Sequence, residues 1–156
     1  MKKYLFIICI VLFFSCKDNT DSTNTNENIN NTETKATSLQ GAWELTSFLN
    51  YREDGSVDTI NSSNSFKQMK MYSETKVMWS RLRTMDSLDW FGVGDYTFKD
   101  GILTEVLDYG SKAMNSRIKS KKNFIFNILL DKDKFTQIEF DSIGKPIYAE
   151  NYLRVK

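Results

Sequence analysis

Beyond Ser38, hydrophobic and polar residues alternate in short runs, which is the pattern of strands that are buried on one face. Turn-forming residues separate these runs about every 8 to 12 positions, a spacing typical of antiparallel sandwiches and barrels. No helical period extends far enough to indicate alternating strands and helices. Two stretches, 82–91 and 110–122, carry no recognisable pattern. The pattern predicts strands over residues 43–51, 57–60, 66–72, 75–81, 92–99, 102–109, 123–130, 135–141 and 147–155.

One hairpin can be predicted together with its register. Asp100-Gly101 is the dipeptide that suits a type I′ turn, because both central residues of that turn need positive φ. Counting outward from the turn pairs Phe98 with Leu103, Tyr96 with Glu105, and Gly94 with Leu107. This set is more apolar than the set on the other face, so it is expected to point inward. Glu105 then places a carboxylate on the buried side of the sheet, and a buried carboxylate needs a partner. The candidates are Arg154, a Tyr hydroxyl, ordered water or a ligand.

The predicted strand over 123–130 is apolar on both faces. Phe126 and Ile128 lie on one face, and Ile125 and Leu129 lie on the other. Such a strand is expected to be buried on both sides or covered by a loop. The polar turn that follows it leaves the register of its pairing open.

The N-terminus has the features of a targeting segment. Lys2 and Lys3 precede an apolar run over 4–14, which is shorter than the about 20 residues that a membrane span needs. The run ends in Ser15-Cys16, and a small residue directly before Cys resembles the lipobox of bacterial lipoproteins. This resemblance implies a signal peptide over 1–15 and acylation of Cys16. A secreted protein cut elsewhere, or an uncleaved anchor, is the alternative.

Polar residues fill the chain between Cys16 and the first predicted strand. Only Ile29 and Ala36 are apolar between residues 17 and 38, too few to offset the entropy of ordering, so a disordered tether is expected over 16–38. The folded domain is then expected over 39–156. Lys17-Asp18 loosely resembles the signals that direct some lipoproteins to the outer face of the outer membrane. We therefore expect a lipid-anchored protein of the bacterial cell envelope, in the outer membrane. The sequence leaves open whether the protein faces the periplasm or the cell surface.

Composition excludes several classes of function. Lys and Arg number 21 against 20 Asp and Glu, so no basic footprint for nucleic acid is present. The chain has no His, and its two Cys, Cys9 and Cys16, both precede the domain, which excludes Ser-His-Asp and Cys-His catalysis there. Gly92 and Gly94 lack the third Gly of a dinucleotide site, and no acidic calcium loop is present. We expect no enzyme activity, no cofactor and no metal.

Four segments, in order, resemble the lipocalin-like (calycin) domain family of small secreted or lipid-anchored bacterial proteins. They are Leu39-Gln40-Gly41-Ala42-Trp43-Glu44-Leu45 at the start, Lys67-Gln68-Met69-Lys70 ahead of Met78-Trp79, Gly94-Asp95-Tyr96-Thr97 before Glu105, and Glu150 to Val155 at the end. The resemblance implies an all-β, antiparallel up-and-down barrel of about eight or nine strands. It also implies that Trp43, behind Gly41, packs beneath Arg154 and closes one mouth of the barrel. Members often carry Trp where this chain has Tyr152.

A barrel of this kind can hold one small ligand. Six residues are candidate ligand contacts: Tyr96, Glu105, Glu150, Tyr152, Trp79 and Trp90, with Gln137 as a further inward-facing residue. The ligand expected is a small amphipathic or hydrophobic molecule. The alternative is that these side chains fill the interior and bond to one another. A second hypothesis, from another class, is a non-enzymatic protein-interaction module, a complex subunit or an inhibitor, that uses exterior aromatic residues such as Phe48 or Tyr51.

The first testable prediction concerns Cys16. Protein extracted from membranes should have lost residues 1–15 and gained acyl chains on Cys16, because the charged start, the short apolar run and Ser15-Cys16 together make a lipoprotein signal. Intact-mass spectrometry measures both changes, and Cys16→Ser is the control that should lack the acyl mass. Recovery of an unmodified protein cut downstream of Cys16 would contradict the prediction.

Overall fold

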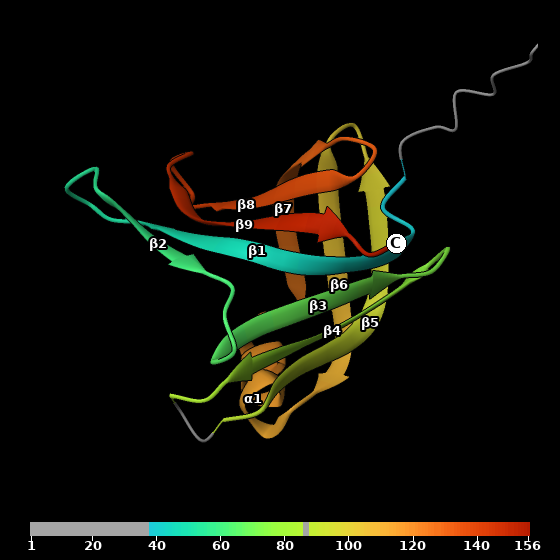
Figure 1. Cartoon of the computed structure of the whole chain (residues 1–156). Helices are drawn as coiled ribbons and strands as arrows, with labels where there is room; N and C mark the ends of the chain where they lie inside the picture. The colour runs from blue at the N-terminus through green and yellow to red at the C-terminus, as the bar shows by residue number, and fades with distance from the viewer. Residues whose placement is uncertain (1–37, 86–87) are drawn as a thin grey trace, which may run out of the picture. The chain divides into compact units, whose positions relative to one another are not determined.

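The protein folds as an all-β domain with one short helix (Figure 1). The computed structural model describes residues 38–85 and 88–156. The predicted signal peptide, the lipidation site at Cys16 and the tether up to residue 37 lie outside the described residues. Within the described part of the chain, no helix combines the length and the apolar character that crossing a membrane requires.

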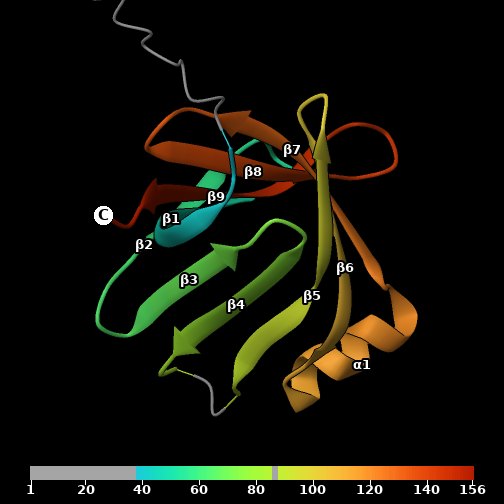
Figure 2. The same ribbon diagram turned by 90° about the vertical axis from the view of Figure 1, so that its right-hand side faces the viewer.

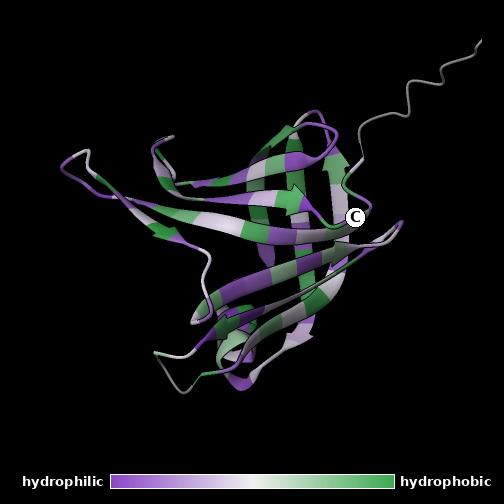
Figure 3. Ribbon diagram, in the orientation of Figure 1, coloured by the Kyte–Doolittle hydropathy of each residue, from purple (hydrophilic) through white to green (hydrophobic). Residues whose placement is uncertain are grey.

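Nine strands and one helix follow one another along the chain. Their bounds are β1 (Gly41–Tyr51), β2 (Val57–Asn61), β3 (Phe66–Tyr72), β4 (Lys76–Arg83), β5 (Trp90–Lys99), β6 (Ile102–Gly110), α1 (Lys112–Ser120), β7 (Asn123–Leu130), β8 (Lys134–Phe140) and β9 (Pro146–Arg154). Each predicted strand is present with its ends shifted by two residues or fewer. Figure 3 shows the reason, since hydrophobic and hydrophilic residues alternate in bands along the strands.

Eight of these strands form a closed antiparallel barrel, and β2 is an extra strand. The strand order is β2-β1-β3-β4-β5-β6-β7-β8-β9, and a further pairing of β1 with β9 closes the sheet. The prediction of an antiparallel barrel is therefore confirmed, and its form is consistent with a lipocalin-like fold. Closure leaves no free edge along the paired parts of these strands, which protects the sheet from pairing with other chains.

The long strand β1 changes partner along its length. It pairs with β3 from Gly41 to Glu44 and with β2 from Ser47 to Tyr51, while β9 accompanies it on the other side. The far half of β1 and β2 therefore project away from the barrel (Figure 1). At the point where they leave β3, Phe48 and Phe66 line a hollow in the wall. This end of the barrel is accordingly the open one.

The predicted register of the β5–β6 hairpin is confirmed. Tyr96 pairs with Glu105, as predicted, and the neighbouring pairs also match. Asp100 and Gly101 have φ values of 52° and 77°, as a type I′ turn requires. The more apolar face of β6 points inward, with Glu105 only 2% exposed.

The expectation for β7 was wrong on one face. Phe126 and Ile128 are buried, but Ile125 is 54% exposed and Leu129 is 67% exposed. Among the described residues, the elements in extensive contact with β7 are its sheet neighbours β6 and β8, so the outward side chains of β7 remain in solvent. Exposed apolar residues of this kind are common on protein surfaces.

The stretch over 110–122, which carried no recognisable pattern, contains helix α1. Its N-cap is Ser111, whose side chain accepts a hydrogen bond from the Met114 backbone N–H at 3.2 Å. Met114 is the only buried residue of the helix, so the helix has almost no apolar periodicity for a sequence to display. The helix packs against β5 and β6 and lies beside the lower part of both strands in Figure 2.

The other end of the barrel is closed by Trp43 and Arg154. Trp43 is fully buried and its indole N–H donates to the Leu39 carbonyl at 2.7 Å. The Arg154 guanidinium carbon lies 3.9 Å from the centre of the Trp43 ring system, a distance at which cation–π attraction contributes about 0.5 to 2 kcal/mol. Gly41 has a φ of 120°, and a Cβ there would lie 2.9 Å from the Arg154 guanidinium. Only glycine therefore fits beneath this cap.

Arg154 also connects separate parts of the chain. Its guanidinium donates to the carbonyls of Gln40, Ser38 and Lys132, at 2.6, 2.8 and 2.8 Å. Beneath it, aromatic rings fill the barrel: Phe135 meets Trp43 edge-on and stacks on Tyr152. We call this the closed end.

Truncation of the cap should destabilise the domain. We expect Trp43→Ala to lower the free energy of unfolding by about 3 to 5 kcal/mol, the usual cost of removing a buried Trp. Arg154→Met should cost less, because the aliphatic stem still packs on the ring. Urea denaturation measures both, with Leu129→Ala on the exposed face as the control that should change by less than about 0.5 kcal/mol. Unchanged midpoints in both cap variants would show that Trp43 and Arg154 do not hold the barrel closed.

Candidate functional site

Five polar side chains form a layer inside the barrel, next to the closed end. They are Gln68, Lys70, Glu105, Gln137 and Glu150, each 3% exposed or less. We call them the polar layer. They come from β3, β6, β8 and β9, where strand alternation directs every second side chain inward. On β3, for example, Gln68, Lys70 and Tyr72 are the buried positions.

Lys70 is the partner of Glu105. Its ammonium lies 2.8 Å from Glu105 Oε1 and also donates to Gln137 Oε1 at 2.8 Å. The Tyr72 hydroxyl donates to the same Glu105 oxygen at 2.8 Å. Of the partners expected from the sequence, a Tyr hydroxyl is present, whereas Arg154 lies at the closed end, where it bonds three carbonyls. The main partner, Lys70, was missed. The signal was available, because apolar Phe66 and Tyr72 bracket Lys70 on one face of β3.

Glu150 is held by a second cation. Its Oε1 lies 2.5 Å from a terminal guanidinium nitrogen of Arg81, and its Oε2 accepts from Gln137 at 2.8 Å and from Gln68 at 3.2 Å. Arg81 also donates to Gln68. Gln137 thus connects the Lys70–Glu105 pair to the Arg81–Glu150 pair. Both buried carboxylates are consequently neutralised and hydrogen-bonded, as burial of charge requires.

Two tyrosines support these carboxylates as donors. Burial, followed by the charge of Glu105, raises the pKa of Tyr72 well above its usual value. Burial and then Glu150 raise the pKa of Tyr152 in the same direction. Both hydroxyls therefore stay protonated at neutral pH, so each can donate to its carboxylate.

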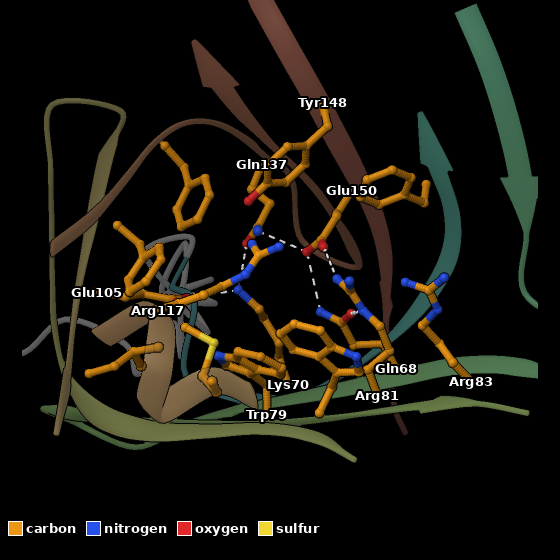
Figure 4. A pocket seen from close by; sticks show the side chains of 16 residues that line it. Gln68, Lys70, Trp79, Arg81, Arg83, Glu105, Arg117, Gln137, Tyr148 and Glu150 are labelled. Atoms are coloured by element: carbon orange, nitrogen blue, oxygen red, sulfur yellow. Dashed lines mark hydrogen bonds and ion pairs between the residues drawn. The ribbon is translucent and has the colours of Figure 1, made fainter. Parts of the chain in front are cut away.

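A cavity of about 300 Å³ lies between the polar layer and the open end of the barrel (Figure 4). The polar layer forms part of its lining. Eight further lining residues are apolar or aromatic: Phe48, Trp79, Trp90, Leu107, Met114, Phe124, Phe126 and Tyr148. Arg81, Arg83 and Arg117 complete the lining. Arg83 and Arg117 are exposed, so they mark where the cavity meets solvent.

Five of the seven residues proposed from the sequence line this cavity. They are Glu105, Gln137, Glu150, Trp79 and Trp90. Tyr152 lies on the side of the closed end, stacked on Phe135 and bonded to Glu150.

Tyr96 is the cross-strand neighbour of Glu105, but it does not belong to the cavity lining. Its hydroxyl donates to the Ser73 carbonyl at 2.9 Å, and its ring meets Tyr72 edge-on. The predicted register correctly paired Tyr96 with Glu105. Their side chains nevertheless point to different partners, because Glu105 bonds to Lys70 and Tyr96 bonds to Ser73.

Gly92 in the barrel wall leaves room for the Trp79 ring. Trp79 on β4 pairs with Gly92 on β5, and a Cβ at Gly92 would lie 2.9 Å from the Trp79 ring. The indole therefore lies against the backbone of β5, which only glycine permits at this distance.

The acidic residues of the described chain do not form a metal site. Within residues 38–85 and 88–156, no three Asp or Glu side chains converge as a metal site would need. Glu105 and Glu150 use their oxygens on Lys70, Arg81 and neighbouring donors.

Comparisons with known proteins add little to this geometry. The chain matches no protein-family model and no curated protein. One solved structure, of an uncharacterized protein from Bacteroides eggerthii DSM 20697, is similar to it, with 14% sequence identity and a TM-score of 0.48. The match covers 76% of this chain and 100% of the other. At this level of similarity it supports no argument about function.

Removing the charge of Glu105 should destabilise the barrel. Glu105→Gln leaves the Lys70 ammonium buried without a counter-charge, so we expect a loss of about 3 to 5 kcal/mol in the free energy of unfolding. The double variant Lys70→Met/Glu105→Gln should recover much of this loss, because no unpaired charge remains and the amide still accepts from Tyr72. Urea denaturation of the two variants tests this. An unchanged midpoint for Glu105→Gln would show that the ion pair does not brace the barrel.

Proposed function

We propose that this protein is a lipid-anchored, lipocalin-like protein of the bacterial cell envelope that binds a small amphipathic molecule in its barrel. The observation that carries the proposal is the cavity beside the polar layer. Its volume of about 300 Å³ lies at the lower end of the range of about 300 to 1,000 Å³ typical of ligand sites. Its lining combines aromatic walls with a few converging polar groups, which is the usual composition of such sites.

The position of the chain's entry into the barrel fits an anchored protein. Ser38, the first described residue, is bonded to Arg154 at the closed end. Phe48, five residues beyond Trp43 on β1, lines the cavity at the other end. A lipid anchor on the segment before Ser38 would therefore attach the barrel by the end opposite its mouth. Ligands could then enter from the solvent.

A second candidate function is a protein-interaction module. On the outside of the barrel, Met71 pairs with Met78, Met78 with Val93, and Val93 with Tyr109. Met71, Met78 and Tyr109 are 44%, 51% and 56% exposed, so the row forms an apolar stripe across four strands. The residues suggested by the sequence fit this role less well, since Phe48 lines the cavity and stacks on Tyr148.

Native mass spectrometry of the full chain, released from lipid nanodiscs, tests the first candidate. The unaltered protein, purified without denaturant, should retain a small molecule, and a refolded, delipidated sample should show the bare mass. Met114→Trp should also show the bare mass, because it places a large ring in the cavity. Leu129→Trp, on the exposed face, is the matched control and should retain the molecule. A bare mass for the unaltered protein would contradict the proposal.

A further inference from the structure

The indole N–H of Trp90 is a buried donor without a partner. Among the described residues, it is the one buried side-chain nitrogen or oxygen that makes no hydrogen bond. Leaving such a donor unsatisfied costs about 1 to 3 kcal/mol, so proteins seldom do so without a reason. The Trp90 side chain lines the cavity, but its N–H is covered in this structure, so an acceptor on a bound molecule could supply the missing bond once the indole turns toward the cavity.

A cation lies beside this donor. The guanidinium carbon of Arg117 is 5.1 Å from the centre of the Trp90 ring system. Arg117 is in the last turn of α1, and Figure 4 shows its side chain extending from the helix toward the polar residues of the cavity. Arg117 is exposed at the mouth of the cavity. Within residues 38–85 and 88–156, its guanidinium contacts the Trp90 ring but makes no hydrogen bond and no ion pair.

The charges of the lining do not cancel. Four cationic side chains, Lys70, Arg81, Arg83 and Arg117, stand against Glu105 and Glu150, which leaves an excess of 4 − 2 = 2 positive charges. Lys70 and Arg81 are paired with the two carboxylates. Arg83 has an interaction of its own. Arg117 is therefore the cation on which recognition of a ligand can rest.

We infer that the cavity selects amphipathic carboxylates. The carboxylate accepts a hydrogen bond from Trp90 Nε1–H and pairs with Arg117, whose guanidinium suits a carboxylate geometrically. The apolar body lies against Leu107, Met114 and Phe126. Together with Arg81, the polar layer is neutral, and both of its cations, Lys70 and Arg81, are paired with Glu105 or Glu150, so neither competes for the headgroup. This inference rests on the proposed function and adds the chemical class of the ligand.

Three probes that differ only in headgroup charge test this inference: octanoate, octanamide and octylamine. Each is titrated by isothermal calorimetry into the full chain in nanodiscs of zwitterionic lipid, with empty nanodiscs as the blank. Octanoate should bind at least about ten-fold more tightly than octanamide, since hydrogen bonds to a charged group contribute more than neutral ones. Octylamine should bind most weakly, because its charge has the same sign as that of Arg117.

Variants then assign the effect to the two residues. Arg117→Gln and Trp90→Phe should each weaken octanoate binding by about ten-fold and should narrow the preference over octanamide. Lys119→Gln is the matched control, because Lys119 is the other basic residue of the last turn and does not line the cavity. Thermal melts check the fold. If Trp90→Phe does not fold, octanoate binding by Arg117→Gln alone decides the test, because Arg117 is exposed and its change should not affect folding.

The outcomes separate this inference from the proposed function. The inference that the cavity selects carboxylates would be overturned by equal affinity for the three probes, or by octanoate binding that Arg117→Gln leaves unchanged. Neither result would contradict the proposed function. Absence of octanoate binding would also overturn the inference. In that case the native mass spectrum of the unaltered protein decides separately whether the cavity holds any small molecule.

Discussion

The structure depends on the pairing of two carboxylates inside a narrow barrel. Burying a charge without a partner costs several kcal/mol, so Glu105 and Glu150 can face inward only because Lys70 and Arg81 come with them. Gln137 bonds to members of both pairs and thereby fixes β3, β6, β8 and β9 relative to one another. Like the alternation of apolar side chains, this set of bonds is satisfied in one register alone. A shift of one residue would turn the charges outward and leave their partners unpaired.

The same layer divides the barrel into two unlike halves. On one side, the rings of Trp43, Phe135 and Tyr152 pack on one another beneath Arg154, which bonds three carbonyls. On the other side, β1 leaves β3 for β2 after Glu44, so the wall is no longer continuous and the interior is not filled. The α1 helix covers part of this end and contributes Met114 and Arg117 to the lining. The point where β1 changes partner thus lies toward the same end of the barrel as the cavity, whose lining includes Phe48 of β1.

The sequence predicted the strands and the β5–β6 register, because these follow from alternation and from the local chemistry of Asp100-Gly101. The packing of Trp43 with Arg154 was predicted only through the resemblance to lipocalin-like proteins. It did not predict Lys70 as an inward residue, since a Lys within a strand is read as solvated when its partner is distant in the chain. It did not predict α1, which has one buried residue and no period. Nor could it show that Tyr96 turns away from Glu105, because a register fixes neighbours and not rotamers. For α1 and Tyr96 the missing information was tertiary, whereas the inward position of Lys70 could have been inferred from apolar Phe66 and Tyr72 on the same face of β3.

The saturation that stabilises the polar layer also limits what the cavity can do. A general base needs a lone pair directed at a substrate, yet Glu150 already accepts from Arg81, Gln68, Gln137 and Tyr152. Glu105 accepts from Lys70 and Tyr72 on Oε1, so it is held in place although its second oxygen takes no part in these bonds. The groups with unused bonding capacity lie instead at the mouth, where Trp90 has a donor without an acceptor and Arg117 has a charge without a counter-charge among the described residues. On the proposed function, recognition of a ligand would therefore rest on Trp90 and Arg117 and not on the two carboxylates.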